Sequence, residues 1–116
     1  MVDLFGLATC DTTRKARRWL ADKGVAHVFH DVRADGVDEA LLRGWARRIG
    51  WRSLLNTSST TWRALGESDK AGLEEDRAVA LMLAHPTLIK RPVLVVKGEA
   101  AAAGFRPEAY AAVLEV

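Results

Sequence analysis

The order of the expected elements constrains this chain more than any other feature of its sequence. Residues 2–5 form a short apolar run that ends at Gly6, which predicts a buried strand. A helical pattern over 13–23 follows, with Gly24 as its C-terminal cap, and a strand pattern over 25–32 comes next. A strand, a helix and a strand in this order predict a βαβ unit, whose right-handed crossover makes the two strands parallel.

The remainder of the chain has a different pattern. Residues 38–84 are helical in spacing, and they precede the uncharged, β-branched run at 93–96, which predicts a central strand. A turn and a returning strand at 100–104 follow, and Pro107 opens a final helix. This order predicts the thioredoxin-like arrangement, an α/β fold in which a four-stranded mixed sheet is flanked by helices, with a helical insert between its two halves. We therefore expect a single domain over residues 1–116.

Composition excludes several classes of function. The 116 residues are 49% hydrophobic, which is enough to bury a core, and 17 Lys and Arg against 15 Asp and Glu give a net charge of +2. That balance is not typical of a protein that neutralises phosphate backbones, so we expect no nucleic-acid partner. No run reaches the roughly 18 apolar residues of a membrane span, and the first residues lack the features of a secretory signal. We expect a cytoplasmic protein with no membrane partner.

The one cysteine, Cys10, stands in a short loop between the first strand and the first helix. A helix N-terminus stabilises an anion, so a thiolate at this place has a lowered pKa, and Arg14 one turn further on could add a positive charge. The alternative is a small buried hydrophobic residue, and position alone leaves both interpretations open. A four-ligand zinc site would need Cys10 and all three histidines, whose spacing does not suggest one, so we expect no metal.

Two known patterns of cysteine chemistry are absent around Cys10. Thr13 occupies the place of the second cysteine in a Cys-x-x-Cys motif, and Ala16 occupies the place of the arginine in a phosphatase-type loop. A redox reaction at Cys10 therefore needs a thiol from outside the chain. Glutathione is the abundant choice in a reducing compartment.

Two Arg-Pro pairs are further candidates. A proline at the entry to a central strand cannot donate to the ladder, so Pro92 predicts either a cis peptide bond after Arg91 or an ordinary trans entry. In a thioredoxin-like fold, a cis turn at this place faces the cysteine at the helix start. Arg106, before Pro107, either points to the same site or is a solvated surface side chain.

Four segments of the chain resemble the arsenate reductase (ArsC) family, in the order found there. They are Cys10-Asp11-Thr12-Thr13-Arg14-Lys15-Ala16, Gly50-Trp51 with Leu54-Leu55-Asn56, Thr60-Thr61-Trp62-Arg63, and His85-Pro86-Thr87-Leu88-Ile89-Lys90-Arg91-Pro92. Within the ArsC/Spx group the chain is similar to the YffB-like branch, whose members are regarded as glutathione-dependent thiol reductases. The resemblance implies a thioredoxin-like fold, in agreement with the element order.

The resemblance also implies roles for single residues. Cys10 matches the nucleophile of the family, and Pro92 matches the position of the cis-proline. Arg91 and Arg106 match arginines that line the oxyanion or glutathione site. The residues expected to bind substrate or glutathione are Thr12, Arg14, Arg91, Pro92 and Arg106.

Asn56 departs from the family pattern. Arsenate reductases linked to glutathione carry an arginine directly after the Leu-Leu pair, and an asparagine cannot supply its charge-assisted hydrogen bonds. The resemblance therefore favours a general thiol–disulfide oxidoreductase over an arsenate reductase. It implies glutathione as co-substrate, no tightly bound cofactor, and a small thiol, disulfide or oxyanion as substrate.

The partners follow from the same resemblance. A glutaredoxin is a further candidate partner of the expected enzyme, which we expect to be a monomer. The alternative is a non-catalytic regulator of Spx type that binds a protein such as RNA polymerase. Many of those regulators use a Cys-x-x-Cys switch, which this chain lacks.

Overall fold

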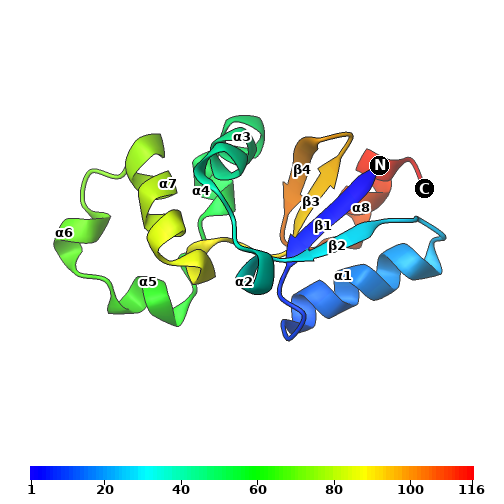
Figure 1. The fold of residues 1–116 in the computed structure, drawn as a ribbon, viewed down its shortest axis with the longest axis horizontal. Coiled ribbons are helices and arrows are strands. Elements are labelled where there is room, and N and C mark those ends of the chain that lie inside the picture. The colour runs from blue at the N-terminus through cyan, green and yellow to red at the C-terminus, as the bar shows by residue number, and fades with distance from the viewer. The chain divides into compact units, whose positions relative to one another are not determined.

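The computed structural model describes residues 1–116, and they form two compact units. Unit 1 comprises Met1–Gly36 and Arg91–Val116, and unit 2 comprises Val37–Lys90. The strands belong to unit 1, whereas unit 2 consists of short helices (Figure 1). None of the helices is both long and apolar enough to pass through a bilayer.

Unit 1 is a four-stranded sheet with helices. Its elements in chain order are β1 (Val2–Gly6), α1 (Asp11–Asp22), β2 (Val28–Asp31), α2 (Val32–Asp35), β3 (Val93–Val96), β4 (Glu99–Ala103) and α8 (Pro107–Leu114). The strands lie in the order β2-β1-β3-β4, with β1 parallel to β2 and the other neighbours antiparallel. The parallel pair confirms the predicted βαβ unit, and the mixed sheet confirms the predicted thioredoxin-like fold.

One face of this sheet carries the core of unit 1. Leu4 of β1 and Leu94 of β3 are fully buried in a cluster with Ala16 and Leu20 of α1 and Tyr110 of α8. Both helices therefore cover the same face. Burial stabilises by roughly 1.5–3 kcal/mol for each large apolar side chain, and it anchors α1 to the strands.

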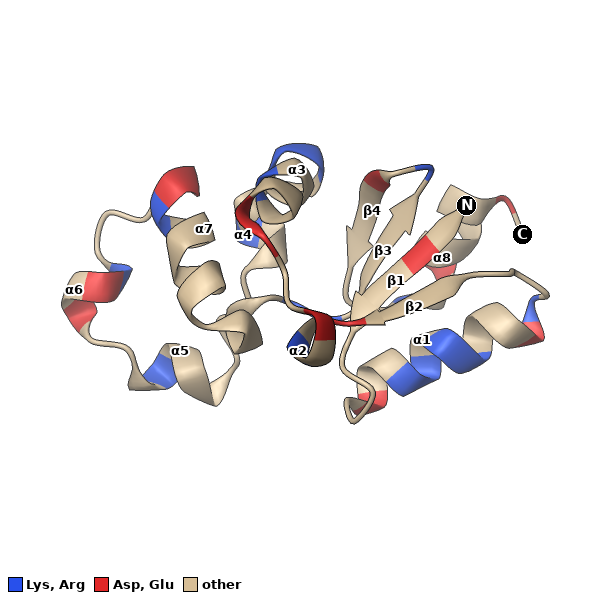
Figure 2. Ribbon diagram, viewed as in Figure 1, with Lys and Arg blue, Asp and Glu red and all other residues tan.

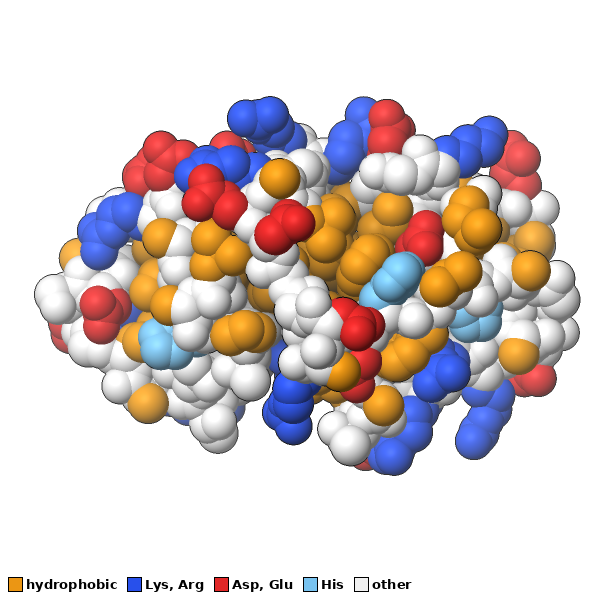
Figure 3. Space-filling view, viewed as in Figure 1, with side chains coloured by type: hydrophobic (Ala, Val, Ile, Leu, Met, Phe, Trp, Pro, Cys, Tyr) orange, Lys and Arg blue, Asp and Glu red, His pale blue; other side chains and the backbone are white.

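The opposite face of the sheet mixes polar and apolar side chains. Asp3 and Phe5 alternate with Leu4 along β1, so they point away from the core. The His30 ring stacks on Phe5 with the ring centroids 4.3 Å apart, and its Nε2 lies 2.8 Å from Asp3 Oδ1. Figure 3 shows histidine and acidic side chains among hydrophobic ones over these strands. These two contacts assign the histidine to the packing of the sheet. No group of three or more metal-ligating side chains is present.

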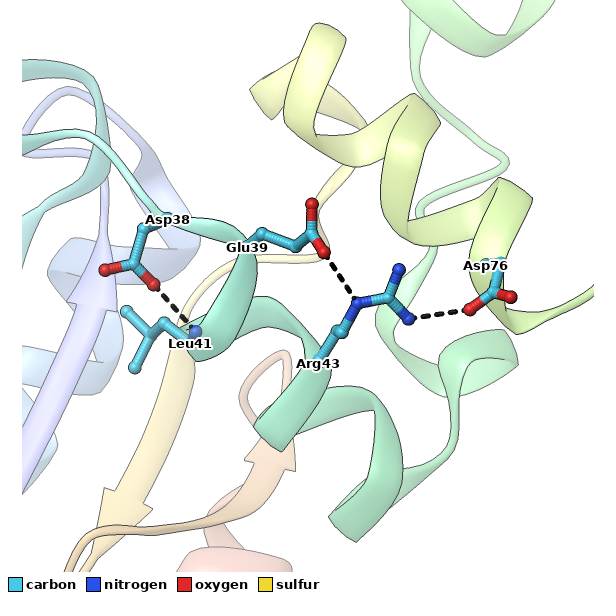
Figure 4. Close-up of polar contacts among 5 residues, drawn as sticks. All are labelled: Asp38, Glu39, Leu41, Arg43 and Asp76. Carbon is cyan, nitrogen blue, oxygen red and sulfur yellow. Dashed lines mark hydrogen bonds and ion pairs between the residues drawn. The ribbon is translucent and has the colours of Figure 1, made fainter.

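Unit 2 contains five α-helices and one 3-10 turn. They are α3 (Glu39–Ile49), α4 (Trp51–Leu54), α5 (Thr60–Ala64), α6 (Glu67–Lys70), α7 (Glu75–Ala84) and η1 (Pro86–Leu88). Arg43 of α3 joins two helices, because its Nε donates to Glu39 at 2.9 Å and its Nη1 donates to Asp76 of α7 at 2.7 Å (Figure 4). The two carboxylates, Asp76 foremost, raise the pKa of Arg43 above its ordinary value. These two ion pairs therefore support the contact between α3 and α7, helices that also contain the buried residues Leu42 and Val79.

Two element boundaries in unit 1 differ from the predictions. The first helix begins at Asp11 rather than at Thr13, because the Thr13 side chain is buried instead of capping the helix, and Cys10 takes the N-cap position. The second strand is shorter than predicted. The N–H of Val25 still bonds to the Leu20 carbonyl at the end of the helix, so the chain becomes extended only later.

The predicted helical stretch at 38–84 is divided by loops. Gly50 ends α3 as expected, with a φ of 86° that favours glycine, and Ser59 caps α5 by accepting from the N–H of Trp62. Two further predictions are confirmed in unit 1. Gly24 follows α1 with a φ of 71°, and Pro107 is the first residue of α8.

Candidate active site

Cys10 ends the turn that leads from β1 into α1. Its N–H donates to the Leu7 carbonyl at 3.0 Å, which closes a β-turn, and its carbonyl accepts the first helical bond, from the N–H of Arg14 at 3.0 Å. The backbone of Cys10 is extended, with φ −82° and ψ 126°, as is usual at an N-cap. The side chain is partly exposed and forms no disulfide. The sequence prediction of a thiol at a helix start is therefore confirmed in its geometry.

The surroundings of Cys10 lower the pKa of its thiol. Burial is the largest single influence and would raise this pKa. It is outweighed by the N–H and hydroxyl of Thr13, the N–H of Thr12 and the positive charge of Arg91, which together favour the thiolate and lower the pKa. Because the thiolate is the nucleophilic form of cysteine, the site is suited to attack on an electrophilic sulfur or oxyanion.

Thr13 supports the thiol from a fully buried position. Its hydroxyl has no hydrogen-bond partner in the structure, and it lowers the Cys10 pKa by favouring the thiolate. Gly6 at the end of β1 permits this placement, because a Cβ at Gly6 would lie 2.6 Å from Thr13 Oγ1 and 2.8 Å from its Cγ2. Sequence reasoning treated Thr13 only as a helix cap and as the missing cysteine. The signal in the sequence for a buried Thr13 is Gly6, a glycine at the end of the strand that precedes the cysteine loop.

The Arg91-Pro92 peptide bond is cis, so the first of the two alternatives for this proline is correct. The Pro92 carbonyl accepts from the N–H of Gly104 at 2.8 Å, and the Gly104 carbonyl accepts from the Tyr110 hydroxyl at 2.8 Å. The turn is therefore held by Gly104, which follows β4, and through it by α8. Sequence reasoning did not identify Tyr110 as a support of this turn.

Arg91 is the positively charged residue that acts on the Cys10 thiol. Its charge favours the Cys10 thiolate and lowers the thiol pKa, although the two residues lie 81 positions apart in the sequence. Its Nε and Nη1 are buried and have no hydrogen-bond partner. Buried guanidinium nitrogens without an acceptor are unfavourable, so these two donors are suited to an anionic group of a ligand.

The other residues predicted to bind substrate or glutathione, Thr12, Arg14 and Arg106, have exposed side chains. Thr12 contributes its backbone N–H to the thiolate, and its side chain is exposed. Arg14 is exposed and bonded to the Asp11 carboxylate. Figure 2 shows further Lys and Arg along α1 beyond its first turn. Arg106 occupies the N-cap of α8 with an exposed side chain to which the structure gives no hydrogen bond or ion pair.

Asn56 lies in unit 2, where its side chain has a local role. Its Oδ1 accepts from the N–H of Ser58 at 3.1 Å, and its backbone carbonyl accepts from the Ser59 hydroxyl at 3.1 Å. This is an Asx-type turn that precedes α5. The asparagine that departs from the family pattern therefore stabilises its own loop.

Comparisons with known proteins agree with this arrangement. A solved structure named YffB protein is 48% identical, covers 98% of this chain and 99% of its own, and superposes with a TM-score of 0.92. An arsenate reductase (ArsC) related protein from Brucella melitensis is 38% identical over 99% of this chain and 95% of its own, with a TM-score of 0.77. An uncharacterized protein of Haemophilus influenzae is 41% identical over 97% of both chains.

The family profile itself covers almost the whole chain. The ArsC family matches residues 5–113, a range that includes Cys10, the Arg91-Pro92 turn and Arg106. The fold is therefore that of a recognised family, and the matched range contains the N-cap thiol and the cis-proline turn. The chain belongs to the ArsC family, as its sequence motifs predicted.

Proposed function

We propose that this protein is a glutathione-dependent thiol–disulfide oxidoreductase with Cys10 as its nucleophile. One observation carries the proposal. The sole thiol of the chain stands at a helix N-terminus with a lowered pKa, in the field of an arginine whose buried donors have no partner. A reactive thiol without a second cysteine requires an external thiol to complete a redox cycle.

The proposed cycle has two exchange steps. The Cys10 thiolate attacks the glutathione sulfur of a mixed disulfide, so that a new disulfide forms between Cys10 and glutathione and the substrate leaves as a thiolate, which takes up a proton. The thiolate of a second glutathione then attacks the glutathione sulfur bound to Cys10. Oxidised glutathione leaves, and the Cys10 thiolate is restored. Each turn of the cycle oxidises one glutathione thiol, because the other half of the oxidised glutathione comes from the mixed disulfide itself. A glutaredoxin could replace the second glutathione.

The binding residues would divide the work. Arg91 would pair with a glutathione carboxylate, and the turn at Pro92 would offer its preceding backbone to the cysteinyl part of glutathione. The remaining contacts with glutathione would come from Thr12 and Arg14 in the first turn of α1 and from Arg106 at the N-cap of α8. The enzyme would act as a monomer. Arsenate reduction is the less favoured activity, because Asn56 replaces a cation of the family pattern.

The test combines thiol titration with turnover. The rate of alkylation of Cys10 is measured against pH, and we expect a thiol pKa below the free value of about 8.5. The reduction of a mixed disulfide of glutathione and a small thiol is then followed with reduced glutathione as donor. Cys10→Ser should abolish turnover, and Arg91→Met should lower kcat/KM by about tenfold or more, whereas Arg18→Met, an exposed arginine of α1, should change neither.

Two results would overturn the proposal. One is a thiol pKa at the free value with slow alkylation, and the other is the absence of turnover in a folded protein. If the folded protein lacks turnover and instead retains RNA polymerase in a pull-down, the Spx-type alternative is favoured. A parallel arsenate assay of the native protein and Asn56→Arg tests the substrate argument, because strong native activity would show that Asn56 does not restrict it.

A further inference from the structure

A single carboxylate connects the turn before Cys10 to a neighbouring helix. Asp31 is the last residue of β2, and it lies beside Gly6, the last residue of β1, in the parallel pair. Its Oδ2 accepts from the N–H of Ala8 at 3.2 Å. Its Oδ1 accepts from the N–H groups of Arg33 and Ala34, at 2.9 and 3.1 Å, and thereby caps α2.

The Ala8 bond acts on the segment that presents the thiol. Ala8 is the second residue of the β-turn that the N–H of Cys10 closes onto Leu7. No other hydrogen bond holds the exposed tip of this turn to the rest of unit 1. The carboxylate therefore fixes the turn at one end, and buried Thr13 fixes the first turn of α1 at the other.

We propose that Asp31 is a positioning residue for Cys10, which holds the turn Leu7–Cys10 so that the sulfur lies against the N–H groups of Thr12 and Thr13. This inference rests on the proposed function only in treating Cys10 as the working thiol. The same three N–H donors, those of Ala34, Ala8 and Arg33, lower the pKa of Asp31, so the carboxylate is ionised and accepts all three bonds at neutral pH.

The sign of the effect separates positioning from simple electrostatics. Removing a negative charge near a thiol favours the thiolate and speeds alkylation. Loosening the turn has the opposite effect, because N–H donors stabilise an anion only when they are aligned with it. Slower alkylation after loss of the Asp31 carboxylate would therefore indicate positioning, and faster alkylation would indicate an effect of its charge.

Two variants remove the Ala8 bond in different ways. Ala8→Pro deletes the donor and leaves Asp31 intact, and proline is favoured at the second position of a β-turn. Asp31→Ser keeps a side chain that can cap α2 but cannot also reach Ala8. Asp35→Asn, in the same helix, is the matched control for loss of a negative charge.

The experiment measures the rate of Cys10 alkylation across pH and confirms folding by circular dichroism. In both variants we expect alkylation at pH near 6.5 to slow by about three- to tenfold and the pH midpoint to rise, with Asp35→Asn unchanged. Rates at or above that of the native protein in either folded variant would overturn the proposal. Alkylation needs no glutathione, so its result can be interpreted even if the protein shows no glutathione-dependent turnover.

A second measurement uses the native protein and does not depend on a variant folding. Amide signals of Ala8, Cys10 and Thr13 are followed by nuclear magnetic resonance as pH falls through the titration of the Asp31 carboxyl. We expect all three to shift with that titration. A response confined to Ala8 would show that the bond does not reach the thiol and would overturn the proposal.

Discussion

At the scale of single residues, the chemistry of this protein depends on side chains that are unremarkable by themselves. Cys10 is one partly exposed thiol, and Thr13 is one buried threonine. Their combination lowers the thiol pKa, because a hydroxyl without another partner favours the thiolate. Such an unsatisfied hydroxyl costs the folded state roughly 1–3 kcal/mol, so the site sacrifices stability for reactivity.

The first prediction separates those two effects in Thr13→Val. Replacing the hydroxyl by a methyl group removes a buried atom that has no hydrogen-bond partner, so the free energy of unfolding should stay constant or rise. The thiol pKa of Cys10 should rise as well, since one stabilising contact of the thiolate is lost. Urea denaturation and pH-dependent alkylation measure the two quantities.

The control for this prediction is Thr57→Val, at an exposed position of unit 2. It should leave the thiol pKa unchanged. A Thr13→Val protein that is clearly less stable than the native one would show that the hydroxyl makes a favourable contact in the thiol form. An unchanged thiol pKa would remove Thr13 from the site.

At the scale of elements, the end of β1 and the start of α1 approach each other closely. Gly6 leaves room for Thr13, and the bonded turn between them places Cys10 at the N-cap. The strand, the turn and the helix together therefore set the position of Cys10. A change at the end of β1 should alter the thiol pKa of Cys10.

Gly6→Ala tests this coupling. The new Cβ would lie 2.6 Å from Thr13 Oγ1, a distance that real Cβ atoms essentially never show, so the Thr13 side chain or the start of α1 must shift. Overpacking of this kind destabilises by about 1–3 kcal/mol, and the thiol pKa should rise in the same variant. Urea denaturation and alkylation again provide the measurements.

A double-mutant cycle identifies the cause of that loss. Thr13→Ala removes both atoms that clash, so Gly6→Ala should cost much less in that background. Gly44→Ala in α3, where nothing lies within 4 Å, should instead stabilise the protein slightly. Additive effects at Gly6 and Thr13 would contradict the proposed contact.

At the scale of the whole molecule, two groups should control how stability varies with pH. Backbone N–H donors lower the pKa of Asp31 below its usual 3.8, so the stabilisation is present above that pH and is lost as pH falls through the folded value. Burial raises the pKa of Tyr110 above its usual 10.0. Its contribution is complete below pH 10.0 and is lost as pH rises, because the unfolded chain ionises first.

The corresponding measurement is the urea midpoint from acid to alkaline pH, in a Cys10→Ser background that removes the thiol titration. Asp31→Asn should flatten the acid limb, and Tyr110→Phe should flatten the alkaline limb while losing the bond to the Gly104 carbonyl. Each variant should leave the other limb unaltered. Limbs identical to those of the native protein would contradict the assignment of these two groups.

The sequence by itself determined the features that depend on near neighbours or on counting. The strand at 93–96, the glycine after α1, the proline that opens α8 and the cysteine at a helix start all follow from local preferences, which act over a few residues. The single cysteine shows without any structure that a redox cycle needs an external thiol. The family motifs predicted the fold correctly.

Only the tertiary structure decided which groups act on the thiol. The charge of Arg91 acts on Cys10 from the turn before β3, Thr13 is buried because Gly6 has no Cβ, and Asp31 holds Ala8 from 23 positions away. The sequence also left two alternatives undecided: a cis or a trans bond between Arg91 and Pro92, and a site-facing or an exposed side chain for Arg106. The structure shows a cis bond and an exposed side chain. The reason is physical: a pKa and a hydrogen bond depend on distance in space, and the folding of the sheet sets that distance between residues remote along the chain.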